Sequence, residues 1–156
     1  MGSGRLLAGI RRWHRYEDCP NAIPQQWSEF RSLGKFPGQC GTVSYGAVCA
    51  HSADSLEYLC AVEVADFKAI DPALGRMRLQ PQHYAVFIHE GPISGIRATW
   101  DGILHDWLPR SGRVAANAPN FERYDERYDP RTGLGGLEIW CALQPAVSQD
   151  PISDGV

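Results

Sequence analysis

The sequence has few of the features that mark common enzymes or nucleic-acid-binding proteins. Its 156 residues carry a net charge of −3, so the chain lacks the basic excess on which general nucleic-acid binding depends. It contains no G-x-S-x-G elbow, no P-loop and no G-x-G-x-x-G, which argues against the common serine hydrolases and nucleotide-binding folds. No stretch is apolar enough to span a membrane, and the amino end has no signal-peptide core.

The cysteines are odd in number and lack the spacing of metal sites. There are five of them, without any Cys-x-x-Cys pair, and Cys49, Cys60 and Cys141 lie inside apolar, strand-like runs. Zinc sites need close pairs of Cys or His, whereas buried free thiols are typical of reducing compartments. We therefore expect a cytoplasmic protein with free thiols and with neither a metal nor a cofactor.

Composition and length favour a single globular domain. Hydrophobic residues make up 44% of the chain and aromatic residues 10%, and no linker rich in Pro, Gly or Ser divides it. A chain of this length can bury most of the apolar surface that it exposes when unfolded. We expect one domain over residues 1–145 and a flexible tail over the polar residues 146–156.

A repeated phrase is the main internal signal. The run Leu137-Glu138-Ile139-Trp140-Cys141-Ala142-Leu143 shares its Leu-Glu, its Cys-Ala and its final aliphatic residue with residues 56–62, which lie 81 positions earlier. Other pairs recur at similar offsets: His14 and His89 at 75, Trp27 and Trp100 at 73, and Tyr45 and Tyr124 at 79. Their shared order indicates a duplicated unit, with a period too long for a solenoid.

Local patterns predict the same order of elements in both copies. The first repeat, about residues 6–64, should contain a strand at 6–16, a helix from an N-cap at Asn21 to about Leu33, and strands at 42–50 and 56–64. Residues 66–75 would connect the halves. The second repeat, about residues 76–143, should contain a strand at 83–89, a helix from Ile93 that ends at Pro109 and Gly112, and extended segments at 121–128 and 137–143. The predicted fold class is α+β: two strand-helix-strand-strand repeats with pseudo-twofold symmetry and an antiparallel sheet.

One acid in the last strand is a candidate ligand-binding residue. Glu138 lies in an apolar segment, and side-chain alternation puts it on the same face as Trp140. A carboxylate there needs a positive or hydrogen-bonding partner, which could be an arginine of the chain or a bound ligand. An aromatic wall with one buried acid suits a lipophilic cation. Glu63 is a second acid within a strand, and it could join such a pocket or face water.

Two segments resemble a known family. The run Gln82-His83-Tyr84-Ala85-Val86-Phe87-Ile88-His89-Glu90-Gly91-Pro92-Ile93 is similar to the second repeat of the GyrI-like small-molecule-binding family. So is the run Tyr124-Asp125-Glu126-Arg127-Tyr128-Asp129-Pro130-Arg131-Thr132-Gly133, followed by Glu138-Ile139-Trp140. The family includes the effector-binding domains of AraC- and MerR-type multidrug regulators and a stand-alone gyrase-inhibitory protein. The resemblance covers about residues 6–145.

The resemblance implies a pocket between the two repeats that accepts bulky aromatic, often cationic compounds. It places the pocket glutamate of the family at Glu138, which would be the counter-ion. The other candidate ligand-binding residues are aromatic side chains and the second acid: Trp140, Tyr45, Tyr58, Trp27, Trp100, Phe87 and Glu63. We therefore expect a small-molecule-binding protein that senses or sequesters xenobiotic compounds.

Two alternatives stay open. Some stand-alone members are similar to hydrolases that open the cyclopropane ring of genotoxic alkylating compounds; in such an enzyme Glu138 would activate water and Tyr45 would stabilise a phenolate. The other alternative is a protein partner, as in gyrase inhibition. Because the first predicted strand starts within ten residues, it leaves no room for a helix-turn-helix. Direct binding to DNA is therefore not expected, and neither is binding to a membrane.

Overall fold

The computed structural model describes residues 4–145, and the tail predicted for residues 146–156 lies outside this range. The elements follow one another as β1 (Arg5–Arg15), η1 (Tyr16–Asp18), α1 (Cys19–Ser32), β2 (Gln39–His51), β3 (Ser55–Val64), β4 (Gly75–Leu79), β5 (His83–Ile88), η2 (Ile93–Gly95), α2 (Ile96–Gly102), η3 (Ile103–Trp107), α3 (Leu108–Ser111), β6 (Asn120–Tyr124) and β7 (Leu137–Leu143). Each hydrogen-bonded pair of these strands is antiparallel.

The seven strands form one sheet in the order β4-β1-β3-β2-β6-β7-β5. The first repeat supplies β1, β3 and β2, the second supplies β6, β7 and β5, and the repeats meet where β2 pairs with β6. The strand order in the second repeat is the reverse of that in the first, as a pseudo-twofold axis between β2 and β6 requires. Strands β3 and β7, which carry the repeated phrase, occupy equivalent places. The predicted α+β fold class and the duplication are confirmed.

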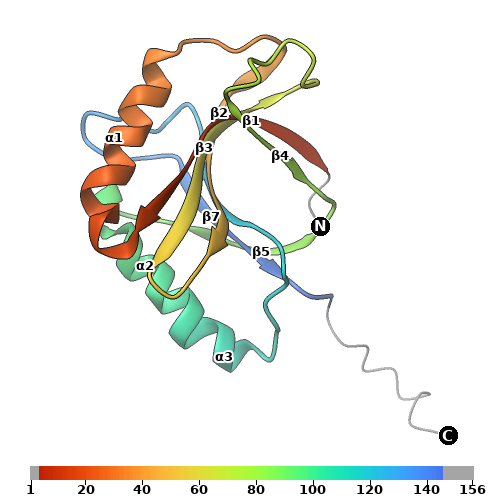
Figure 1. Cartoon of the computed structure of the whole chain (residues 1–156). Helices are drawn as coiled ribbons and strands as arrows, with labels where there is room; N and C mark the ends of the chain where they lie inside the picture. Colours follow the sequence, from red (N-terminus) through yellow and green to blue (C-terminus); the bar gives the residue numbers. More distant parts are fainter. Residues whose placement is uncertain (1–3, 146–156) are drawn as a thin grey trace, which may run out of the picture.

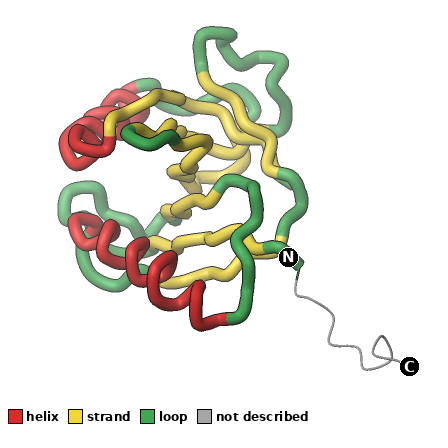
Figure 2. Tube along the Cα trace, turned by 60° about the horizontal axis from the view of Figure 1, so that its bottom comes forward, coloured by secondary structure: helices red, strands yellow, loops and turns green. Residues whose placement is uncertain are grey.

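Both helical segments cover the same side of the sheet, which we call the helix face (Figure 1). Figure 2 shows one segment over each half of the strongly twisted sheet. Beneath α1, the core contains Ala8 and Cys60, which are fully buried, and Ile10. Beneath α2 and α3, it contains Ile139 and Cys141, which are also fully buried. The two cores lie on either side of the seam between β2 and β6.

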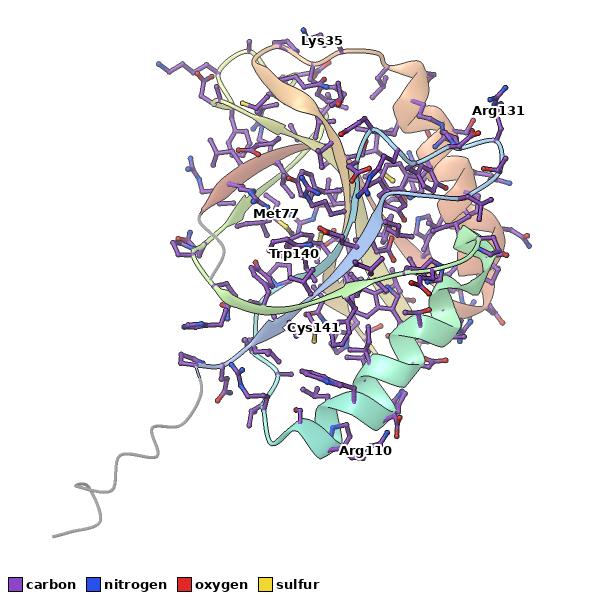
Figure 3. The ribbon with its side chains drawn as sticks, turned by 180° about the vertical axis from the view of Figure 1, so that it is seen from behind. Lys35, Met77, Arg110, Arg131, Trp140 and Cys141 are labelled. Carbon is purple, nitrogen blue, oxygen red and sulfur yellow. The ribbon has the colours of Figure 1, made fainter. Side chains whose placement is uncertain are left out.

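The other side of the sheet, which we call the opposite face, is packed by side chains of the sheet itself. Leu7, Leu59 and Phe121 are almost completely buried there. Trp140 and Met77 pack against this cluster, on the side away from the helices (Figure 3). The rings of Phe121 and Trp140 stack with their centroids 5.3 Å apart. The alternation predicted for β7 is therefore confirmed, because its odd-numbered residues face the helices and Trp140 does not.

Helix α1 begins earlier than the sequence predicts. Its N-cap is Asp18 rather than Asn21, no side chain caps it, and a proline, Pro20, lies in its first turn. Proline is tolerated there because the first N–H groups of a helix have no acceptor within the helix. The predicted end is close to the observed one, because α1 ends at Ser32 and Gly34 follows with a φ of 73°.

The second helical segment continues through Pro109 to its predicted end at Gly112. The chain passes from α2 through a π-helical turn, η3, into α3, and Pro109 lies in the first turn of α3 rather than after the helix. Pro109 cannot donate an N–H to the preceding helical turn, and it directly follows the π-helical turn η3. Gly112, with a left-handed φ of 75°, ends the segment as predicted.

The sequence analysis does not predict strand β4. This strand has five residues and pairs with β1 at one edge of the sheet. Its apolar side chains, Met77 and Leu79, alternate with Arg76 and Arg78. In so short a segment the two arginines conceal the apolar pattern, and only the pairing with β1 identifies the strand.

Candidate functional site

Among residues 4–145, Glu122 on β6 is the one acidic residue that the fold buries, with 7% of its surface exposed. Its Oε1 accepts hydrogen bonds from the hydroxyls of Tyr58 (2.7 Å) and Tyr124 (2.6 Å). Its Oε2 accepts a hydrogen bond from the indole nitrogen of Trp100 (2.9 Å). The indole nitrogen of Trp27 in turn donates to the Tyr58 hydroxyl (3.3 Å). We call these five residues the Glu122 cluster.

The two repeats build the Glu122 cluster jointly. Glu122 and Tyr124 are two residues apart on β6 and therefore share the helix face. Tyr58 reaches them from β3 of the first repeat, while Trp27 comes from α1 and Trp100 from α2. These indoles are the pair that recurs at an offset of 73 positions. The duplication thus directs one tryptophan from each repeat towards the same acid.

A glycine provides the space for this carboxylate. Gly46 on β2 lies directly opposite Glu122 in the strand register. A Cβ atom at Gly46 would lie 1.9 Å from the Tyr58 hydroxyl oxygen and 3.0 Å from Glu122 Oε1. Any side chain at this position would force Tyr58 and Glu122 apart. The hydrogen bond between β3 and β6 therefore depends on the missing side chain of the strand between them.

The two phenols remain hydrogen-bond donors. Burial, followed by the nearby negative charge of Glu122, raises the pKa of Tyr58 well above its ordinary value of 10.0. The same two causes raise the pKa of Tyr124 well above 10.0. Both hydroxyls therefore keep their protons at neutral pH and donate them to the carboxylate.

Glu122 has no cationic partner within the part of the chain that the structure describes. The ion pairs found among residues 4–145 do not include it. Its donors are neutral, so they satisfy its oxygens without cancelling its charge, and a charge in a low-dielectric region attracts a cation strongly. The rings of Trp27 and Tyr124, whose centroids are 5.1 Å apart, add aromatic faces that also favour positive charge. This arrangement suits an aromatic cation.

The structure brings three of the predicted ligand-binding residues to Glu122: Tyr58, Trp27 and Trp100. Two others, Tyr45 and Trp140, lie on the opposite face. There the guanidinium of Arg5 lies 5.8 Å from the Tyr45 ring centroid and 5.7 Å from that of Trp140. The offset that relates Tyr45 to Tyr124 does not reflect structural equivalence, because Tyr124 is on the helix face.

The remaining predicted residues, Phe87 and Glu63, lie apart from the cluster. Phe87 packs edge-on against Trp107, with ring centroids 4.9 Å apart, in the core under the second helical segment. Glu63 is partly exposed, and its Oε1 lies 3.9 Å from Arg5 Nε. Neither residue has a partner in the Glu122 cluster.

Glu138, the predicted counter-ion, does not reach the Glu122 cluster because it lies on the opposite face. Its Oε1 is 3.5 Å from Arg123 Nη1 and accepts a hydrogen bond from the Trp140 indole (3.0 Å). Arg123 lies directly across from Glu138 in the register of β6 and β7. Of the two partners that the sequence allows for Glu138, the structure supplies the arginine.

The sequence analysis misses Glu122, although a signal for it is present. In the run Phe121-Glu122-Arg123-Tyr124, the acid is two positions from Tyr124, and an aromatic residue precedes it. Charged neighbours make the run look polar and exposed, whereas Glu138 lies in a segment that looks buried. Only the pairing of β6 with β2, opposite Gly46, places Glu122 inside the protein.

Three other buried polar residues, His14, Gln26 and His89, have structural partners. Nε2 of His14 and Oε1 of Gln26 share a hydrogen bond of 2.5 Å, and Gln26 Nε2 donates to the Ile10 carbonyl (2.8 Å). In the second repeat, His89 bonds to the Thr99 hydroxyl and to a backbone carbonyl, each at 2.8 Å. These two histidines, which recur at an offset of 75 positions, tie each first strand to the helix that follows it.

Two surface depressions lie away from Glu122. One of about 340 Å³ borders Arg5, Glu63 and Arg78, and another of about 330 Å³ borders Trp107 and Arg110. We place the candidate site at Glu122 because neither depression combines a buried charge with aromatic walls. Across residues 4–145, no group of three or more His, Cys, Asp or Glu side chains could hold a metal ion. Within the same residues, no helix is long and apolar enough to cross a membrane.

Solved structures with a similar fold support the architecture. The structure of SAV2435 bound to tetraphenylphosphonium aligns with a TM-score of 0.72 at 16% identity, covering 92% of this chain and 90% of that one. A cryo-EM structure of an EcmrR–DNA complex aligns with a TM-score of 0.64 at 15% identity, covering 93% of this chain and 56% of that one. At these identities the likeness is one of fold.

Sequence comparison connects the chain with a regulator and with a family. The transcriptional regulator BrlR of Pseudomonas aeruginosa is 28% identical over 113 residues, which are 69% of this chain and 41% of BrlR. The chain thus matches less than half the length of that relative. The family described as the GyrI-like small molecule binding domain matches residues 3–144. The chain belongs to the GyrI-like small-molecule-binding family.

Proposed function

We propose that this chain binds bulky aromatic cations at the seam between its two repeats, with Glu122 as the counter-ion. The observation that carries the proposal is the buried carboxylate of Glu122, which has three neutral donors and no cationic partner among residues 4–145. A buried charge without an opposite charge is costly, and functional sites are where such costs are retained. A cationic ligand would supply the missing charge.

The walls of the proposed site are the half-buried indoles of Trp27 and Trp100 and the phenols of Tyr58 and Tyr124. Because these side chains fill the space around Glu122, a ligand must displace at least one of them. Trp100 is the best candidate, since its indole is half-buried and holds Glu122 by a single hydrogen bond. The phenols are more deeply buried and would stay in place as donors.

SAV2435 has been solved with tetraphenylphosphonium bound, which makes this cation a suitable first probe. The chain matches part of a transcriptional regulator, so we propose that its binding reaction serves to sense or sequester such compounds. Binding at Glu122 would place the ligand on the helix face, between segments of both repeats. A ligand could thereby change how the repeats pack against each other.

The test compares tetraphenylphosphonium with triphenylphosphine oxide, a neutral compound with similar rings. We expect the wild-type protein to bind the cation and to show quenching of tryptophan fluorescence, because two indoles border the site. Glu122→Gln should weaken binding of the cation roughly tenfold to a hundredfold, the effect of about 1.5–3 kcal/mol expected for a contact to a charged group. Binding of the neutral compound should change far less.

Glu138→Gln is the matched control. Both acids accept a hydrogen bond from an indole, but Glu138 already has Arg123 as its partner and lies on the opposite face. Its substitution should leave the affinity for the cation unchanged. The proposal fails if Glu138→Gln reduces the affinity as much as Glu122→Gln, or if Glu122→Gln weakens the two compounds equally.

A further inference from the structure

The sheet has two edge strands, and they differ in how they are protected. Strand β4, at one edge, has five residues and includes Arg76 and Arg78. Charged side chains are a usual means by which proteins keep a sheet edge from pairing with another chain. Strand β5, at the other edge, has the sequence His-Tyr-Ala-Val-Phe-Ile. It contains no proline, and the histidine at its start is its one ionisable side chain apart from the tyrosine.

The unprotected edge also exposes large apolar side chains. Val86 is 45% exposed and Ile88 is 74% exposed, and both point to the opposite face together with Tyr84. The other side chains of the strand, such as Phe87, pack into the core beneath the second helical segment. The exposed residues therefore form a row along the outermost strand.

The backbone of this edge is free to pair. The N–H of His89 donates to the carbonyl of Leu137 (3.0 Å), so the alternate residues His83, Ala85 and Phe87 bond to β7. The N–H and C=O groups of Tyr84, Val86 and Ile88 then point away from β7. Within residues 4–145, no backbone hydrogen bond from another segment reaches these groups.

We propose that β5 pairs in antiparallel fashion with β5 of a second copy of this chain, about a twofold axis at Val86. The strand is self-complementary in this register. Tyr84 lies opposite Ile88 of the partner, and the small Ala85 lies opposite the large Phe87. The outward backbone groups at Tyr84, Val86 and Ile88 meet their equivalents, so the two sheets become continuous.

The proposed interface is independent of the proposed ligand site. Val86 and Ile88 lie on the opposite face at the far edge of the second repeat, whereas Glu122 lies on the helix face next to the central seam. Failure of one proposal therefore leaves the other intact. Ligand binding can be measured on monomeric variants of β5.

The experiment combines sedimentation with residue-resolved amide hydrogen exchange on the full chain. We expect a dimer at concentrations below about 1 mM, in which the amides of Tyr84, Val86 and Ile88 gain protection as the concentration rises. Val86→Lys should give a monomer, because two lysines would face each other across the axis. The isosteric Val86→Thr should keep the dimer, since it adds no charge and retains the backbone bonds.

A charge exchange identifies the register. Val86→Glu alone should also be monomeric, but a one-to-one mixture with Val86→Lys should form a heterodimer, because residue 86 then faces an opposite charge. Ile88→Lys serves as a second variant should Val86→Lys fold poorly, since Ile88 is 74% exposed. A monomer at about 1 mM, or a dimer whose β5 amides stay unprotected, overturns the proposal. So does a mixture that remains monomeric.

Discussion

Glu122 and Glu138 both lie beside a tryptophan, but they differ in whether an arginine lies next to the carboxylate. Each accepts a hydrogen bond from an indole nitrogen, from Trp100 at 2.9 Å and from Trp140 at 3.0 Å. Glu138 also faces Arg123, whereas Glu122 has only neutral donors. The comparison teaches that an acid beside a tryptophan is not in itself a cation site. What distinguishes the candidate site is that, among residues 4–145, no cationic side chain lies within ion-pair distance of Glu122.

Strand β6 supplies both Glu122 and the arginine that pairs with Glu138. Glu122 and Arg123 are consecutive on β6, so their side chains point to opposite faces of the sheet. The acid enters the helix face and the arginine neutralises Glu138 on the other. The predictions that follow alter one member of this comparison at a time, beginning with the largest expected effect.

Gly46→Ala should have the largest effect because it removes the space in which Tyr58 meets Glu122. The new methyl group would lie 1.9 Å from the Tyr58 hydroxyl oxygen, and the rearrangement should lower the free energy of unfolding by about 3 kcal/mol. Urea titration measures the change. Gly102→Ala is the control: a Cβ there meets no atom within 4 Å, and the helix α2 should gain up to about 1 kcal/mol. Equal effects would contradict this account of Gly46.

Tyr58→Phe should have the next largest effect. It removes a donor of the buried Glu122 carboxylate and the acceptor of the Trp27 indole. A lost bond to a charged group costs about 1.5–3 kcal/mol of unfolding free energy. Tyr84→Phe on the opposite face, where no side-chain hydrogen bond of Tyr84 is seen within residues 4–145, should change stability by about 0.5 kcal/mol or less. A similar cost for both substitutions would argue against a special role for Tyr58.

Alkaline pH should lower the free energy of unfolding through the tyrosines that donate to Glu122. Burial and then Glu122 raise the pKa of Tyr58 above its ordinary value of 10.0, so the folded protein keeps a proton that the unfolded chain releases. The resulting stabilisation is complete below pH 10 and is lost as the pH rises from there towards the folded-state pKa, at a limiting slope of about 1.4 kcal/mol per pH unit for each such tyrosine. Unfolding titrations above pH 10 should show a shallower slope for Tyr58→Phe. An unchanged slope would exclude Tyr58 as a source.

Arg123→Gln should have the smallest effect on stability. Its ion pair with Glu138 is long, at 3.5 Å, and both side chains are about a quarter exposed, so the pair should contribute only about 0.2–1 kcal/mol. The substitution makes Glu138 resemble Glu122 in lacking a cation. Measurement of tetraphenylphosphonium binding to this variant sharpens the comparison: affinity at the seam should stay as in the wild type, because Arg123 points away from it.

The fold was largely predictable from the sequence because the duplication left the same residues at similar offsets in both repeats. The shared phrase identified β3 and β7, and the recurring His14/His89 and Trp27/Trp100 pairs identified equivalent positions near the two helices. Strand β4 escaped because its pairing with β1 joins distant segments and its own pattern is weak. The position of Pro109 within α3 depends on a π-helical turn that no simple period indicates.

The candidate site was less predictable, for a definite physical reason. The sequence predicts Trp27, Trp100 and Tyr58 as ligand-binding residues because large aromatic side chains are candidates for the walls of a site. The choice between Glu122 and Glu138 depends on which residues lie across from each on neighbouring strands: Gly46 in one case and Arg123 in the other. Such cross-strand register is a long-range property that hydropathy does not encode.

The pairing of Gly46 with Glu122 therefore determines that the charged side chain beneath the helices is a carboxylate. If β6 slipped by a single position along β2, every side chain of β6 would exchange faces, and a guanidinium would stand where the carboxylate now lies. The same composition and nearly the same backbone would then repel the cations that we expect it to receive. The sign of the charge beneath the helices thus depends on which residues of β6 occupy even positions, so a single insertion or deletion within β6 would turn the proposed cation site into a site for anions.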